Sequence, residues 1–469
     1  MRHEREHFYP SALRDFRSVR APEGLGVFAS GDRHFDNAVF GRDSIEVAED
    51  LLGKDPDLVE TVILTLARLQ GTDDRAVSEE EPGKIHHEFR PGEVAGKPIP
   101  RHSAAILDSL LERWSDQAGR ARKELTYYGS VDATPGYLRL IGRFCDEHGN
   151  AILSRVVESR AGERTTVRET VDRAAEWLTR NLEASRSGLL EYRRRNPRSL
   201  KHFYWKDSGT GLLHEDGAEP AIERPVGATA VQGLAVDALD SAAQLVGKSD
   251  SAQAERWKRL GAHVARKTLS LLWLPERGYF ASGFDRCSDG RLRLVTTESS
   301  DQGLLLDSAI FQYESPSEYQ GHVSAILRRL CSSEFMTDYG VRSRALRHAT
   351  LTDHADYHGS FAVWPKETHD LARGMRRQGF SRLADELERR NIRAVNESGA
   401  NQELLYVDER GHLVDYRSLP GARRPERLQA WTVSAILEAK RRRGSRGLPI
   451  FSGADGWKRA LETELLESI

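Results

Sequence analysis

Apolar residues along this chain recur mainly at the spacing of an α-helix, at intervals of three and four positions. Gly71 follows the apolar stripe at residues 58–69 and is placed to end a helix there. The stripe that begins at residue 428 runs into basic residues, which suit the negative end of a helix dipole. The pattern therefore predicts a mostly helical protein. The predicted helical segments are residues 58–69, 106–114, 167–178, 231–239 and 428–444.

Signals for β-strands are few. Residues 291–297 alternate and predict a short strand, and residues 411–416 predict part of a hairpin. The strand–helix alternation of a parallel sheet is missing from the sequence, and no long Pro/Gly/Ser linker divides it. We expect one large helical domain over residues 36–469, with long loops and minor β-hairpins, preceded by an extension over residues 1–35.

Composition narrows the class of protein. The chain has 469 residues, 39% hydrophobic and 30% charged, which suits a large core under a well-solvated surface. The formal net charge of -2 and the lack of a long basic tract argue against a nucleic-acid partner. No run approaches the ~18 apolar residues of a membrane span, and the charged N-terminus does not read as a secretory signal. Three cysteines in no zinc or redox spacing argue against a disulfide framework, so we expect a cytoplasmic protein.

The segment 204–209, Tyr-Trp-Lys-Asp-Ser-Gly, carries the clearest chemical signal. Asp207 follows Trp205 closely, and an indole beside a carboxyl removes water and raises the pKa of that carboxyl. A general acid must be protonated at the working pH, so this setting favours a catalytic Asp207. Lys206 would lower the pKa of Asp207 if its ammonium came close.

Several polar loop residues fit the binding of sugar hydroxyls. Arg42 and Asp43 lie just before a predicted helix, where Asp43 is either a sugar ligand or an N-cap. Asp132 follows Tyr127 and precedes a helical stretch, so it is either a substrate-binding carboxylate beside a stacking ring or a helix cap.

The tract 81–90 contains adjacent histidines, His86 and His87, and could suggest a metal site. Sequence neighbours point apart on a strand or a helix, whereas the zincin motif separates its histidines by one helical turn. We expect no metal here, and interpret Glu88 and Arg90 as an ion pair or as sugar contacts.

Two further segments contribute candidates. Trp364 lies in the aromatic loop 356–365 and is either a flat wall for a sugar ring or core packing. Glu403 precedes the last helical stripe, which carries Trp431, and without further context an exposed loop glutamate is the commonest interpretation.

Taken together, these segments resemble the amylo-α-1,6-glucosidase family, the glucosidase portion of glycogen-debranching enzymes. The resemblance runs from about Phe40 to Ile436, and its strength comes from six motifs in the expected order. The motifs are residues 40–44, 80–85 with His87-Glu88, 127–135, 205–209, 357–360 with 363–365, and 429–431.

The resemblance implies an all-α fold, an (α/α)6 barrel or six-hairpin toroid, with a pocket at one end. It also implies that Asp207 is the general acid and Glu403 the general base of an inverting hydrolysis that needs no metal and no organic cofactor. Such carboxyl pairs lie about 6.5–9.5 Å apart. The expected substrate-binding residues are Arg42, Asp43, Glu88, Arg90, Tyr127, Asp132, Trp205, Lys206, Trp364 and Trp431.

The leading hypothesis is thus a glycoside hydrolase that releases glucose from an oligosaccharide or small α-glucoside, with glycogen-debranching activity. The chain departs from the family pattern at Ala230, at residues 366–369 and around Glu403. One alternative is therefore a hydrolase of the same barrel acting on a smaller α-glucoside such as trehalose. Another is an inactive glycan-binding or scaffold protein. The sequence leaves the oligomeric state open.

Overall fold

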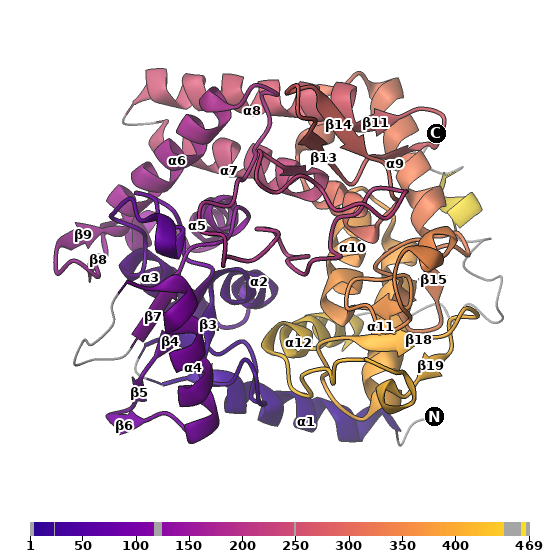
Figure 1. Cartoon of the computed structure of the whole chain (residues 1–469), viewed down its shortest axis with the longest axis horizontal. Coiled ribbons are helices and arrows are strands. Elements are labelled where there is room, and N and C mark those ends of the chain that lie inside the picture. The colour runs from indigo at the N-terminus through magenta and orange to yellow at the C-terminus, as the bar shows by residue number, and fades with distance from the viewer. Residues whose placement is uncertain (1–3, 23, 117–123, 248–249, 445–460, 466–469) are drawn as a thin grey trace.

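A computed structural model describes residues 4–22, 24–116, 124–247, 250–444 and 461–465, and α-helices dominate it (Figure 1). The α-helices are α1 (Glu4–Val19), α2 (Gly41–Leu51), α3 (Pro56–Arg68), α4 (Arg101–Trp114), α5 (Ala133–His148), α6 (Val167–Ala184), α7 (Thr229–Val246), α8 (Ser251–Leu272), α9 (Pro316–Leu330), α10 (Pro365–Arg377), α11 (Ser381–Ser398) and α12 (Ala430–Gly444). The 3₁₀ helices are η1 (Ala76–Ser78), η2 (Asn150–Ser154), η3 (Ser300–Asp307), η4 (Ile310–Tyr313), η5 (Leu346–Leu351) and η6 (Tyr416–Ser418).

The strands form small antiparallel sheets at the edges of the helices. The two-stranded sheets pair β1 (Arg20–Ala21) with β2 (Gly26–Val27), β5 (Glu93–Val94) with β6 (Lys97–Pro98), β8 (Val156–Glu158) with β9 (Arg164–Thr166), β11 (Trp273–Leu274) with β12 (Tyr279–Phe280), and β15 (Met336–Thr337) with β16 (Gly340–Val341). The three-stranded sheets are β3 (Val39–Phe40), β4 (Glu88–Pro91) and β7 (Glu124–Tyr127); β10 (Gly227–Ala228), β13 (Gly283–Arg286) and β14 (Leu292–Val295); and β17 (Ala362–Val363), β18 (Leu405–Val407) and β19 (Leu413–Val414).

These elements confirm the mostly helical prediction with minor β-hairpins. The five predicted helical segments fall in α3, α4, α6, α7 and α12, and the two predicted strands are β14 and β19. The predicted hairpin forms between β18 and β19. Apolar periodicity was therefore a reliable guide wherever it was strong.

The helices pack in two rings. In the inner ring α2 packs on α5, α5 on α7, α7 on η3, η3 on α10, α10 on α12, and α12 returns to α2. Each inner element also carries an outer partner: α3, α6, α8, α9, α11 and α1 pack on α2, α5, α7, η3, α10 and α12, respectively. Figure 1 shows α2, α5, α10 and α12 around the centre of the molecule, with α3, α6 and α8 further out.

The first helix belongs to this packing. Ala12, Phe16 and Val19 of α1 lie in one buried apolar cluster with Trp364 and Trp431. Helix α1 thus supports the inner helix that carries Trp431. The domain boundary at residue 35 remains a prediction.

Gly41 allows the first turn of α2 to approach the chain just before β4. A Cβ atom at this position would lie 2.1 Å from the carbonyl oxygen of His86, closer than any real contact. The Gly41 N–H donates to the carbonyl oxygen of His87 at 3.0 Å. This close approach sets Arg42 beside His87.

Candidate active site

Two irregular segments carry the predicted catalytic acids. Asp207 lies between α6 and β10, and Glu403 lies just before β18. The Val131 N–H donates to the carbonyl oxygen of Phe203 at 2.6 Å, which ties the first segment to the chain before α5. The Glu403 N–H donates to the carbonyl oxygen of Glu426 at 2.9 Å, which fastens the second segment ahead of α12.

Asp207 faces two nitrogen groups. Its Oδ2 atom lies 3.6 Å from Nη1 of Arg42 and 3.9 Å from Nε2 of His87. Its side chain is 28% exposed, while those of Arg42 and His87 are 9% and 3% exposed. Burial raises the pKa of Asp207 to about 6, and the Arg42 guanidinium opposes that rise. Asp207 is therefore the accessible member of this group and titrates near neutral pH.

Asp132 holds Arg42 in place. The Arg42 Nε and Nη2 atoms donate to the two carboxylate oxygens of Asp132 at 2.8 and 3.3 Å, a forked pairing that fixes the guanidinium plane. The Ser130 hydroxyl donates to the same carboxylate at 2.6 Å. Asp132 occupies the N-cap position of α5, yet its side chain makes no capping bond. Asp132 therefore lies at the predicted cap position, but its side chain binds Arg42 instead of capping the helix.

Asp43 lies in the first turn of α2, and the N-cap residue of that helix is Phe40. The Gln429 amide donates to Oδ2 of Asp43 at 3.0 Å. Burial raises the pKa of Asp43 to about 7, and Arg42 opposes the rise. The structure thus sets a second carboxyl with a raised pKa next to the Arg42–Asp207 group.

Glu403 lies deeper, with 4% of its surface exposed. The Tyr357 hydroxyl donates to Oε1 of Glu403, and the Glu426 N–H donates to Oε2 at 3.3 Å. Burial raises the pKa of Glu403 to about 8, while these two donors favour its ionised form. Glu403 is therefore not the exposed loop glutamate that a sequence pattern favours.

Tyr357 lies close to both acids. Burial raises the pKa of its phenol well above the usual value, and the negative charges of Glu403 and Asp207 raise it further. Sequence reasoning did not select this residue, although its segment was recognised. A tyrosine two positions before a glycine, in a loop rich in aromatic residues, was the available signal.

Several aromatic rings of the predicted site contact one another. Trp364 contacts Trp205 edge-on at 5.6 Å between ring centroids, Tyr357 at 4.7 Å and Trp431 at 6.0 Å. His358 stacks on Trp364 at 5.1 Å. The structure therefore brings the three predicted tryptophans together as one wall, next to Tyr357.

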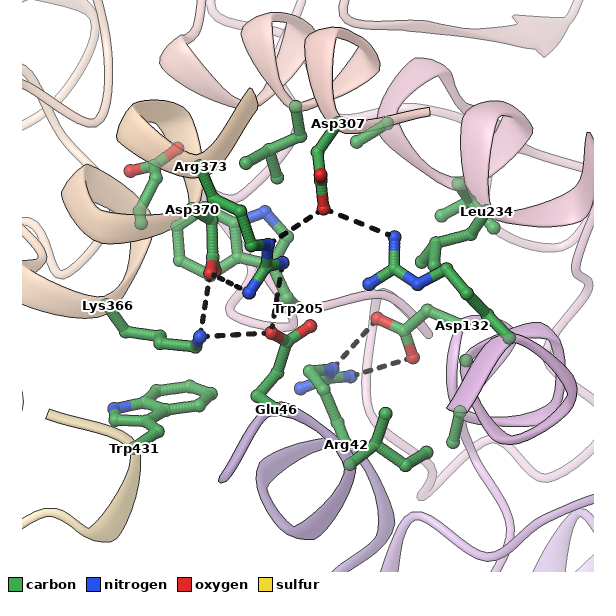
Figure 2. A pocket seen from close by; sticks show the side chains of 18 of the residues that line it. Arg42, Glu46, Asp132, Trp205, Leu234, Asp307, Lys366, Asp370, Arg373 and Trp431 are labelled. Carbon is green, nitrogen blue, oxygen red and sulfur yellow. Dashed lines mark hydrogen bonds and ion pairs between the residues drawn. The ribbon is translucent and has the colours of Figure 1, made fainter. Parts of the chain in front are cut away.

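A cavity continues from this wall between the inner helices (Figure 2). Arg42, Asp132, Trp205, Trp364 and Trp431 line one part of it. Ion-paired side chains of α2, α5, η3 and α10 and apolar residues such as Val231, Leu234 and Leu304 line the rest. Neither Asp207 nor Glu403 lines this cavity itself. Each acid is nevertheless one contact away from it. Asp207 pairs with Arg42, which lines the cavity. Glu403 accepts from Tyr357, and Tyr357 packs on Trp364, which also lines the cavity.

The remaining predicted sugar contacts lie on the three-stranded sheet β3–β4–β7. Arg90 donates to the Glu88 carboxylate, and also to the carbonyl oxygen of His34 at 2.8 Å. Tyr127 is fully buried, with one ring face stacked on Trp114 at 3.9 Å. Glu88 raises the pKa of Asp207. Glu88 and Arg90 thus form the predicted ion pair within electrostatic range of Asp207. Tyr127 packs against Trp114.

Lys206 points away from this group. Its ammonium donates to the carbonyl oxygen of Ser343 at 2.7 Å and lies 3.1 Å from the Asp301 carboxylate and 3.6 Å from that of Glu367. The side chain is only 1% exposed. Of the predicted sugar contacts Lys206 meets Trp205, whose ring centroid lies 4.8 Å from its ammonium, and its ion pairs are with Asp301 and Glu367 rather than with Asp207.

His87 is a site residue that sequence reasoning set aside once the metal hypothesis was rejected. Among the described residues, the structure contains no cluster of three or more His, Cys, Asp or Glu side chains suited to a metal ion. Within the same part of the chain, no helix is long and apolar enough to cross a membrane.

Comparisons with known proteins give a structural likeness only. No protein-family model matches the chain, and no curated protein sequence matches it. The GH63 mannosylglycerate hydrolase of Thermus thermophilus in complex with glucose is similar with a TM-score of 0.59 at 16% identity, over 92% of this chain and 99% of that one. Its complex with Tris gives 0.57 at 15% identity, over the same shares of both chains.

An uncharacterized conserved protein from the same organism matches with a TM-score of 0.50 at 16% identity, over 92% of this chain and 98% of that one. Likenesses at this level of identity concern the path of the chain, not its chemistry. This protein therefore shares the helical fold of the GH63 mannosylglycerate hydrolase structures.

Proposed function

We propose that this protein is an inverting glycoside hydrolase that releases glucose from α-glucosides in a pocket at one end of an (α/α)6 barrel. Asp207 protonates the leaving oxygen, and Glu403 activates the attacking water. The observation that carries the proposal is the Tyr357 phenol: it donates to Glu403, and the negative charge of Asp207 raises its pKa, so the two carboxyl groups lie within electrostatic range of one side chain. The GH63 structures show that a fold of this kind can carry a glycoside hydrolase site.

The surroundings of each acid suit its proposed role. Asp207 is the more exposed, so it can reach the oxygen between glycon and leaving group. Glu403 is held at both oxygens by Tyr357 and the Glu426 N–H, which orients it toward a water on the other face of the sugar. Arg42 and Asp43 supply charged partners for sugar hydroxyls, and Trp205 and Trp364 supply flat apolar surfaces.

The two pKa values predict a bell-shaped pH dependence of kcat/KM, with limbs near 6 and 8 and a maximum near 7. With pKa values of about 6 for Asp207 and about 8 for Glu403, the pair carries one proton between these limits. Below pH 6 both groups are protonated and no base remains, and above pH 8 both are ionised and no acid remains. Initial rates at subsaturating substrate between pH 4.5 and 9.5 measure the profile, and a flat profile over this range contradicts it.

The order of the two values adds a constraint. Because burial raises the pKa of Glu403 above that of Asp207, the proton of the singly protonated pair favours Glu403. The proposed roles use the minor form, in which Asp207 carries the proton. Its low population limits the rate without changing the shape of the profile.

The product distinguishes this proposal from its rivals. We expect glucose release with inversion, so that an α-glucoside yields β-glucose first, followed by proton NMR before mutarotation is complete. A panel of a branched α-1,6-glucan, isomaltose, trehalose and a small acidic α-glucoside separates debranching activity from hydrolysis of small glucosides. If no glycoside in the panel is cleaved although glucose binds, the glycan-binding alternative holds instead.

The choice between a polymer and a small glycoside is part of the proposal. The motifs that resemble the amylo-α-1,6-glucosidase family favour the α-1,6 linkage. The neighbouring mannosylglycerate hydrolase is named for a small glycoside, and the departures at Ala230 and residues 366–369 favour a small substrate as well. Relative kcat/KM values across the panel decide between them.

A further inference from the structure

His87 is held rigidly beside Asp207. The backbone N–H of His87 donates to the carbonyl oxygen of Tyr127 at 2.7 Å, and the backbone carbonyl oxygen of His87 accepts from the Gly41 N–H at 3.0 Å. The imidazole lies edge-on between the rings of Phe40 and Tyr127, at 5.2 and 5.7 Å between centroids. With 3% of the side chain exposed, the ring has little freedom to turn.

Two nitrogen atoms lie close to Oδ2 of Asp207 without a direct hydrogen bond to it, so an oxygen beside all three can bond to more than one of them. Nε2 of His87 at 3.9 Å and Nη1 of Arg42 at 3.6 Å are both beyond a direct hydrogen bond, which spans about 2.7–3.2 Å. Polar atoms at such separations are commonly bridged by an oxygen that bonds to both. Asp207 is the exposed member of the three, so a bridging group enters from its side.

The chemistry of the three groups selects a neutral hydroxyl. An anionic group would be repelled by the Asp207 carboxylate, and a cationic group by the Arg42 guanidinium. A hydroxyl accepts from Arg42 and still donates one proton. Burial and the nearby Arg42 hold the pKa of His87 well below its usual value, so the imidazole is neutral and offers one donor and one acceptor nitrogen.

We propose that His87, with Arg42, binds the hydroxyl at C2 of the glycon and thereby sets the preference of the pocket for the sugar configuration at that carbon. The inference rests on the proposed function, in which Asp207 reaches the oxygen on C1. The hydroxyl on the neighbouring carbon of the same ring is then the nearest one to His87. Glucose and mannose differ at this carbon alone, so His87 is a specificity-determining residue.

Binding of free sugars to the intact protein tests the inference without turnover. Isothermal titration calorimetry gives Kd values for glucose, mannose and 2-deoxyglucose with the wild type and with His87→Phe, which keeps a ring between Phe40 and Tyr127. Because the hydrogen bonds of one hydroxyl are lost, we expect the wild type to bind glucose roughly tenfold more tightly than 2-deoxyglucose. His87→Phe is expected to keep only the part of this preference that the Arg42 hydrogen bond supplies, because the bond to His87 alone is removed.

His86→Phe is the matched control. His86 is also buried and is adjacent in sequence. The charges that lower the pKa of its imidazole are those of Arg160 and Arg68, whereas Arg42 lowers the pKa of His87. This variant is expected to keep the wild-type preference for glucose, and His87→Gln, which keeps a donor and an acceptor, to retain more of it than His87→Phe does. Thermal midpoints of all variants report folding.

The inference is overturned if His87→Phe keeps the wild-type preference, if the wild type binds glucose and 2-deoxyglucose equally, or if it binds neither. Failure of the hydrolase proposal has a different signature. In that case no α-glucoside is cleaved while the glucose preference still depends on His87. Cleavage without any dependence on the C2 hydroxyl removes the His87 inference alone.

Discussion

Replacing Asp207 by Asn is expected to slow hydrolysis of an unactivated α-glucoside by about 10²–10⁴-fold, because the leaving oxygen then departs without a proton. The effect is expected in kcat, since binding of the glycon still has Arg42, Asp43 and the tryptophan wall. Glucose release under initial-rate conditions measures it. Glu219→Gln is the matched control, because Glu219 follows on the same irregular segment and is 46% exposed in a surface pair with Lys201.

A substrate with an easy leaving group separates the two roles. Fluoride needs no protonation, so Asp207→Asn is expected to cleave α-glucosyl fluoride at a rate near that of the wild type. Glu403→Gln lacks the base and is expected to lose both activities. The reverse pattern, with Glu403→Gln spared on the fluoride, would exchange the roles of the two acids. An Asp207→Asn enzyme as active as the wild type on the unactivated substrate rules out acid catalysis by Asp207.

The elements that sequence reasoning recovered are those with one apolar face. Helices α3 and α7 show regular buried apolar positions, and both were predicted. Helix α10 was missed because it buries Lys366, His369 and Asp370. Its buried side therefore mixes these charged and polar residues with Leu371 and Met375, which weakens the apolar pattern. A method that equates burial with apolarity cannot find such a helix.

The same limit applies to the site. The Arg42–Asp132 pair joins residues ninety positions apart, and only the packing of α2 on α5 brings them together. Sequence patterns identified both residues as candidates, but not their mutual contact. For Lys206 the position beside Asp207 was misleading, because consecutive residues on an extended segment point in opposite directions.

The inner helices are joined by charges as well as by apolar contacts. Lys366 lies 3.1 Å from Glu46 and 2.7 Å from Asp370, and Arg373 pairs with Asp307 at 2.9 Å (Figure 2). Lys366 also lies 3.1 Å from Asp50. The pairs of Lys366 with Glu46 and Asp50, and of Arg373 with Asp307, join α10 to α2 and η3 and form only when these elements are packed as observed. The network therefore specifies how these elements meet below the site, more than it adds to net stability.

Lys206→Met is expected to lower the free energy of unfolding by about 3–5 kcal/mol, the range for breaking a buried ion pair by removing one partner. Lys206 and Asp301 are each 1% exposed, and both carboxylate oxygens of Asp301 are without a hydrogen bond. Burial already raises the pKa of Glu367 to about 8, and Lys206 opposes that rise. Without the ammonium, two buried carboxyl groups lose their counter-charge.

Denaturant unfolding measures the loss, and Lys201→Met is the matched control on the same segment. Lys201 pairs with Glu219 at the surface, with side chains 43% and 46% exposed, so its removal is expected to cost no more than about 1 kcal/mol. Adding Asp301→Asn to Lys206→Met is expected to restore part of the stability, because the stranded charge is removed. Equal unfolding of Lys206→Met and the wild type would contradict a structural role for Lys206. The activity of the double variant reports separately on the placement of Asp207, because Lys206 and Asp207 are adjacent in the chain. If the double variant folds but displaces Asp207, kcat is expected to fall more on unactivated glucosides than on α-glucosyl fluoride.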